Sequence, residues 1–228
     1  MLGSLNKLNF SLIFILNIIL PTIVSSQSEN ETFFLSNVYL QYNPTNSTSS
    51  YGSGFFIFKK YDSLQSKIFL VTNKHVLPPE GVAKDLTIKF PYIEHNLFTS
   101  KELKISIFDT NKIYNKLIKK HRNNEIDVAI IDVTEVLSSI KYKIRPLSFD
   151  LLASNDDLTN NEIYIGDDIL VLGYPDGIYD EKLLLPLVRS GIISSLPAND
   201  YHYNLNMRNK YDLPSTLHGF LIDAKIFP

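Results

Sequence analysis

The stretch Leu70-Val71-Thr72-Asn73-Lys74-His75-Val76 decides the interpretation of this sequence. An apolar run ends at Thr72, and a histidine follows three residues later, so we predict a strand that ends just before His75. A strand end holds a side chain rigidly yet leaves it exposed, and imidazole titrates near neutral pH. A general base needs these properties, whereas a lone surface histidine is the plainer interpretation of the same spacing.

An acidic residue precedes another apolar run, in Asn124-Glu125-Ile126-Asp127-Val128-Ala129-Ile130-Ile131. A carboxylate at the start of a buried strand can orient a histidine ring and stabilise its protonated form, so Asp127 is the candidate acid. An aspartate that caps a turn before a strand would give the same pattern. Asp132 is the rival acid, and its position inside the strand favours a structural role.

Short strands are predicted from residue 27 onward, because apolar residues recur with a period of two. Residues 55–58 and 67–72 flank a polar turn and are predicted to form a hairpin. Further strands are predicted at 85–90, 103–108, 128–133, 169–172, 190–194 and 220–224. Residues 113–120 favour one or two helical turns, and loops are predicted at 43–51, 153–161 and 198–215. The fold class that follows is all-β, as a barrel or a sandwich.

Composition narrows the function classes. The 228 residues are 44% hydrophobic and 20% charged, and the net charge of −2 gives no electrostatic reason to predict nucleic-acid binding. The absence of cysteine excludes disulfides, thiolate metal sites and a cysteine nucleophile. His95 and His121 lack further ligands at helical or hairpin spacing, so we predict neither a metal nor a cofactor.

The first 26 residues are predicted to be a cleaved signal peptide. Lys7 precedes an apolar run over 10–24, and small residues precede Gln27. A membrane anchor is the alternative, although the run is shorter than the roughly 20 residues of a spanning helix. We therefore predict a secreted, extracellular protein that has no membrane contact after cleavage. Sequons at Asn30 and Asn46 have meaning only in a eukaryotic host.

Four motifs, in this order, resemble those of the trypsin-like serine peptidases of the chymotrypsin fold, in particular their disulfide-poor branch. Gly52-Ser53-Gly54-Phe55 resembles the glycine-flanked strand of that family. Residues 71–76 resemble its histidine motif and residues 125–129 its aspartate motif. Gly173-Tyr174-Pro175 and residues 188–194 resemble strands of its second barrel. The resemblance implies that His75 is the general base and Asp127 the acid of a catalytic triad.

The resemblance also implies two six-stranded β-barrels with the active site between them. We expect a first barrel at 27–142 that carries His75 and Asp127, and a second barrel at 143–228. In this family a serine attacks the substrate carbonyl, the histidine takes its proton, and the aspartate orients the ring. The implied function is a secreted endopeptidase whose partner is a protein or peptide substrate, while specificity and oligomeric state stay open.

The serine motif of that family, Gly-Asx-Ser-Gly, does not occur in the 228 residues. Ser190, Ser194 and Ser195 lie on a strand that precedes the nucleophile in the family, and no glycine follows Ser215. Residues 220–228 resemble the segment that leads into the nucleophile loop. We therefore expect the chain to end just before its serine, with an incomplete second barrel. The explanations left open are a truncated gene model, an inactive pseudo-peptidase that binds peptides or proteins, and an unrelated β protein.

The segment around residues 198–218 is rich in tyrosine and also carries two histidines. Tyr201, Tyr203 and Tyr211 could line a recognition surface, although packing of a long loop is the plainer interpretation. His218 could approach the cleft from its place near the end of the chain, but no sequence pattern assigns it a role. The same holds for His202.

Overall fold

The computed structural model describes residues 27–224 except 45–48, 63–64, 80–82, 84, 96, 108–115, 140–143, 161, 212 and 214. The predicted signal peptide, the predicted barrel boundary at residue 142 and the sequon at Asn46 lie outside the described residues and stay predictions. In the described part of the chain, no helix has both the length and the apolar character needed to cross a bilayer.

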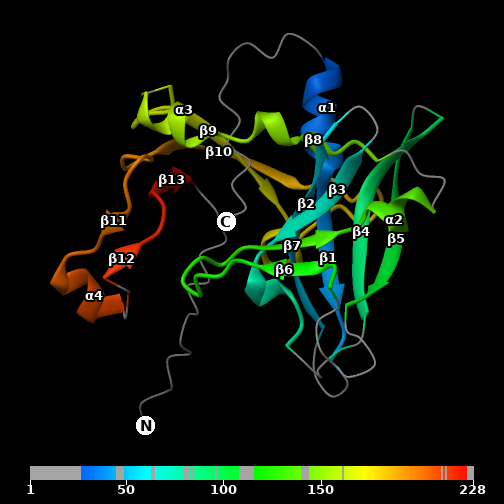
Figure 1. Cartoon of the computed structure of the whole chain (residues 1–228), viewed down its shortest axis with the longest axis horizontal. Helices are drawn as coiled ribbons and strands as arrows, with labels where there is room; N and C mark the ends of the chain where they lie inside the picture. Colours follow the sequence, from blue (N-terminus) through cyan, green and yellow to red (C-terminus); the bar gives the residue numbers. More distant parts are fainter. Residues whose placement is uncertain are drawn as a thin grey trace.

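The first half of the chain forms an eight-stranded sheet (Figure 1). Its strands are β1 (Asn37–Tyr42), β2 (Ser50–Lys60), β3 (Ser66–Thr72), β4 (Asp85–Glu94), β5 (Leu97–Ser106), β6 (Ile118–Lys120), β7 (Ala129–Asp132) and β8 (Leu147–Ser148). The order is β5-β4-β1-β2-β3-β7-β6, and β8 adds to β2 as the one parallel pair of this sheet in the described residues. The resemblance implied a six-stranded barrel. The observed sheet has eight strands, which include the short strands β6 and β8.

The predicted hairpin is confirmed, because β2 and β3 pair antiparallel with Phe56 opposite Leu70. The apolar run of β2 is continuous because both of its faces are covered. Phe56 is fully buried in the main core, whereas Phe55 and Ile57 pack on the other face against Leu147 of β8. Burying each such side chain contributes about 1.5–3 kcal/mol to the stability of the fold. A chain without disulfides depends on this contribution.

The main core lies inside the curled sheet. Leu86, Ile88 and Phe90 alternate with more exposed residues along β4 and are fully buried. The two edge strands, β5 and β6, both line one apolar cavity through Ile105 and Ile118, so the sheet closes on itself into a barrel.

The second half forms two smaller sheets. β9 (Asp168–Gly173), β10 (Leu187–Ile193) and β13 (Ile222–Ala224) form an antiparallel sheet in the order β13-β10-β9, and β11 (Tyr201–His202) pairs with β12 (Thr216–Leu217). The small hydrophobic core of this half of the chain consists of Ile163, Ile169 and Ile193. The all-β fold class is confirmed, while the expectation that the second barrel is incomplete stays a prediction.

Short helices precede or connect these strands. They are α1 (Gln27–Ser36), α2 (Thr134–Ser138), α3 (Asn155–Thr159) and α4 (Leu205–Tyr211), with the 3-10 turns η1 (Lys74–Val76), η2 (Phe149–Leu151) and η3 (Pro175–Gly177). Figure 1 shows α4, β11 and β12 on the side of the molecule opposite β4 and β5.

Several local predictions were wrong. Residues 118–120 are strand β6 and not helix, because pairing with β7 satisfies their backbone. The predicted loop at 153–161 contains α3, which begins with a capping box: the Ser154 hydroxyl accepts from the Asp157 N–H, and the Asp157 carboxylate accepts from the Ser154 N–H. The predicted loop at 198–215 contains β11 and α4.

Candidate active site

His75 lies on the turn η1, directly after β3, as the sequence predicts. The N–H of Val76 donates to the carbonyl of Asn73 at 3.2 Å, which closes the turn. Val76 is buried and packs on β2, where a Cβ atom at Gly52 would lie only 2.5 Å from Val76 Cγ2. Glycine at position 52 therefore lets the histidine turn approach β2 closely.

The structure brings His75 and Asp127 together. Nδ1 of His75 forms a hydrogen bond with Oδ2 of Asp127, and the backbone N–H of His75 donates to Oδ1 at 3.2 Å. Asn73 adds a third link, because its Nδ2 donates to the backbone carbonyl of Asp127 at 2.8 Å. Three hydrogen bonds from one strand end thus orient the aspartate and the imidazole ring against each other.

This geometry selects one tautomer of the neutral ring. An ionised carboxylate only accepts hydrogen bonds, so Nδ1 carries the proton and Nε2 keeps its lone pair. The His75 side chain is 38% exposed and that of Asp127 35% exposed, so Nε2 belongs to a ring that solutes can reach. Such a ring can accept a proton from a bound hydroxyl or water.

No serine completes this pair in the part of the chain that the structure describes, where Asp127 is the one hydrogen-bond partner of the His75 ring. Ser195 is nearly buried, and its hydroxyl accepts from the Leu221 N–H at 2.7 Å. Ser190 and Ser215 are exposed. None of these three serines forms a hydrogen bond with His75 in the described residues.

The rival acid, Asp132, has a structural role. Its carboxylate accepts from Lys67 Nζ and from Thr134 Oγ1, each at 2.6 Å, beside the end of β7. Partial burial of Asp132 acts to raise its pKa, but the hydrogen bonds from Lys67 and Thr134 outweigh it and lower the pKa. Asp132 is therefore a stabilising contact between β3 and β7, whose strand register places it opposite Phe69.

The motif Gly173-Tyr174-Pro175 joins the two halves of the chain. The Tyr174 N–H donates to the Ser53 hydroxyl on β2 at 2.8 Å, and the buried Tyr174 hydroxyl donates to the Leu184 carbonyl at 2.8 Å. The ring of Tyr174 meets the ring of Tyr39 edge-on at 5.7 Å. Burial raises the pKa of Tyr174. The sequence motif predicts where this contact lies, and the structure shows that it holds the two halves of the chain together.

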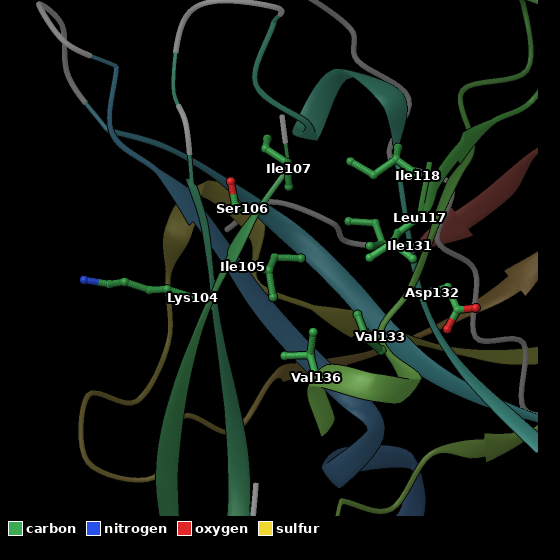
Figure 2. A pocket seen from close by; sticks show the side chains of 10 residues that line it. All are labelled: Lys104, Ile105, Ser106, Ile107, Leu117, Ile118, Ile131, Asp132, Val133 and Val136. Carbon is green, nitrogen blue, oxygen red and sulfur yellow. The ribbon is translucent and has the colours of Figure 1, made fainter. Parts of the chain in front are cut away.

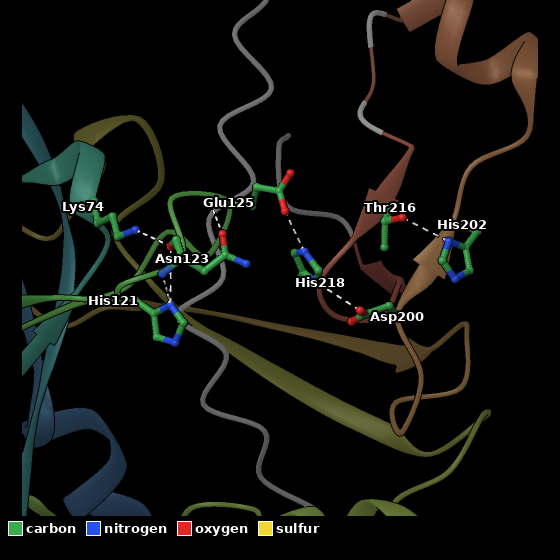
Figure 3. Close-up of polar contacts among 8 residues, drawn as sticks. All are labelled: Lys74, His121, Asn123, Glu125, Asp200, His202, Thr216 and His218. Atoms are coloured by element: carbon green, nitrogen blue, oxygen red, sulfur yellow. Dashed lines mark hydrogen bonds and ion pairs between the residues drawn. The ribbon is translucent and has the colours of Figure 1, made fainter.

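His218 is the functional candidate that sequence reasoning passed over. Figure 3 shows its ring between two carboxylates, Glu125 and Asp200. Glu125 lies two residues before Asp127, so His218 reaches the loop that carries the candidate acid. His202, by contrast, contacts Thr216 through Nδ1 at 3.1 Å (Figure 3).

The sequence predicts no metal site at His95 or His121. His95 occupies an exposed turn between β4 and β5, and the ring of His121 contacts the backbone of Asn123 in its own loop. Within the described ranges, no three His, Asp or Glu side chains gather as metal ligands.

A cavity of about 160 Å³ lies away from His75, between β5 and β6 (Figure 2). Its walls are mostly apolar, and Lys104 extends away from it in Figure 2. The cavity lies where the two edge strands of the first barrel, β5 and β6, face each other.

Comparison with known proteins identifies the family. A model of the trypsin-like peptidase domain matches residues 52–221, a range that includes His75 and Asp127. Among solved structures, Deg5 is similar with a TM-score of 0.44 and 18% identity over 87% of this chain and 75% of Deg5. The HL collagenase is similar with a TM-score of 0.39 and 16% identity over 72% of this chain and 60% of the collagenase. No curated protein sequence matches. Because the family model covers most of the chain, the chain belongs to the trypsin-like peptidase domain family.

Proposed function

We propose that this chain is a secreted trypsin-like serine endopeptidase in which His75 is the general base and Asp127 the acid of a His–Asp–Ser triad. The observation that carries the proposal is the hydrogen bond between His75 Nδ1 and the Asp127 carboxylate, two residues 52 positions apart. The match to the trypsin-like peptidase domain supports protein or peptide substrates.

The chemistry follows from the ring geometry. With Nδ1–H donating to Asp127, Nε2 of His75 takes the proton of a serine hydroxyl while the serine oxygen attacks the substrate carbonyl carbon. The imidazolium that results faces the Asp127 carboxylate, which stabilises it, and then gives the proton to the leaving amine. Backbone N–H groups beside the serine would bind the oxyanion.

The nucleophile is the part of the proposal to which no motif of these residues corresponds. We expect it in a Gly-Asx-Ser-Gly segment, which the 228 residues lack. The 228 residues alone should therefore show no peptide hydrolysis by the triad route. Secretion belongs to the same proposal and is supported by the apolar run at 10–24.

The test begins with the transcript beyond codon 228 and with the protein that it encodes. We expect a continued reading frame with a Gly-Asx-Ser-Gly segment, secretion of the product, and labelling of its serine by a fluorophosphonate. D127N should reduce the rate of peptide cleavage about 10⁴-fold, because the ring then adopts the wrong tautomer.

The matched control is D132N, which removes the rival acid. This variant loses the contact with Lys67 and should unfold at a lower temperature, while its labelling rate stays that of the wild type. A stop codon after residue 228, together with a folded and secreted protein that binds peptides without labelling, would instead establish the pseudo-peptidase. Equal loss of labelling in D127N and D132N would refute the assignment of the acid.

A further inference from the structure

His218 connects two parts of the chain that are distant in sequence. Its Nε2 lies 2.8 Å from Oε2 of Glu125, and its Nδ1 lies 2.9 Å from Oδ2 of Asp200 (Figure 3). His218 follows β12 and Asp200 precedes β11, so both belong to the second half of the chain. Glu125 belongs to the loop between β6 and β7 in the first barrel.

The two contacts define the protonation state of the ring. Carboxylates only accept hydrogen bonds, and a neutral imidazole has a single N–H. Both ring nitrogens can therefore donate to their carboxylates only when His218 is an imidazolium. The hydrogen bond with Glu125, followed by that with Asp200, raises the pKa of His218 above 6.5.

The loop that His218 contacts is the one that carries Asp127. Within it, the His121 N–H donates to the Val128 carbonyl at 2.9 Å, and the Glu125 N–H donates to the Asn123 side chain at 3.0 Å. From the first barrel, Lys74 Nζ donates to the Asn123 carbonyl at 2.7 Å. Contacts from both halves of the chain thus meet on residues 121–128.

We propose that His218 is a positioning residue, whose imidazolium ties Glu125 to Asp200 and so holds the loop that presents Asp127 to His75. Its importance for catalysis rests on the proposed function, because the loop matters there only if Asp127 orients His75. Glu125 and Asp200 are the ionisable groups that contact the ring. Nearby, His202 on β11 contacts Thr216.

The proposal has a direction with pH. The pKa of His218 is raised in the folded protein. The hydrogen bonds to both carboxylates are therefore present below pH 6.5, and one of them is lost as the pH rises through the raised pKa. Above it, the neutral ring can donate to only one of the two carboxylates, Glu125 or Asp200. The ring then no longer links Glu125 to Asp200, so the loop at 121–128 is held less firmly.

Nuclear magnetic resonance on the 228-residue chain tests this tie without any peptidase assay. The chain has five histidines, and their Cε1–H signals are assigned by single His→Gln variants. We expect the His218 signal to titrate above pH 6.5, and its midpoint to shift downward in both E125Q and D200N. Amide protection at 121–128, corrected for intrinsic exchange rates, should be lost as the pH rises through the midpoint measured for His218.

A second readout reports on the His75–Asp127 pair. The Nδ1 proton of His75, which faces a carboxylate, should exchange with water faster in H218Q than in the wild type at pH 6. The pH dependence of protection at 121–128 should disappear in H218Q. H202Q is the matched control, because His202 has a hydroxyl partner and not two carboxylates, and it should leave every readout unchanged.

Two results would overturn the proposal: an unshifted His218 midpoint in E125Q and D200N, or equal protection of 121–128 in H218Q and the wild type at pH 6. If H218Q does not fold, E125Q and D200N give the same test through the carboxylates. No readout depends on a serine or on cleavage. A failed peptidase assay beside a confirmed tie would therefore refute the proposed function alone.

Discussion

Substitution of Gly52 by alanine should displace the turn that carries His75. The new Cβ atom would lie 2.5 Å from Cγ2 and 2.7 Å from Cγ1 of Val76, whereas carbon atoms pack at about 3.5–4.0 Å. More than about 1 Å must therefore be accommodated. Val76 is 6% exposed and β-branched, so its side chain can neither move to solvent nor change rotamer freely. Overpacking of this kind costs about 1–3 kcal/mol.

The cost has a specific rescue. V76A alone removes two methyl groups and should destabilise by about 1.6 kcal/mol, at ~0.8 kcal/mol for each. In the double variant G52A/V76A the two changes compensate, so urea unfolding should give a loss about 1–3 kcal/mol smaller than the sum of the single losses. The His75 Cε1–H signal should shift in G52A and return toward its wild-type position in the double variant.

A matched glycine variant separates the steric effect from a general effect of alanine. Gly166 has a φ of +92° and no atom within 4 Å of a Cβ, so G166A should destabilise by backbone strain of about 1–2 kcal/mol. Its loss should add to that of V76A without compensation, and the His75 signal should not move. Strict additivity of G52A and V76A would refute the argument that Gly52 makes room for the histidine turn.

Two further predictions concern the contacts around this site. Y174F leaves the carbonyl of Leu184 without its buried partner and should cost about 1–3 kcal/mol in urea unfolding, and an unchanged midpoint would contradict the joint between the two halves. The lowered pKa of Asp132 means that its stabilising effect is complete above pH 3.8 and is lost as the pH falls through the lowered pKa. The small stability difference between the wild type and D132N should therefore decrease as the pH falls below 3.8, and a difference that grows over this range would refute this origin.

Patterns within a few residues of each other predicted most of the longer strands, although β1 was not among them. Alternation along β4 and the apolar run of β2 are local properties, because successive side chains of a strand point to opposite faces. The short strands β6, β11 and β12 were missed for the complementary reason. Two or three residues contain no periodicity, and they become strand only through a partner elsewhere in the chain.

The sequence by itself determined the residue types and their order: a histidine after a strand, an aspartate before another, and no Gly-Asx-Ser-Gly segment. The tertiary structure decided that Asp127 and not Asp132 reaches His75, and that His218 reaches Glu125. The physical reason is sequence separation. Hydrogen bonds that join residues 52 and 93 positions apart depend on the path of the whole chain, which no local pattern of side chains encodes.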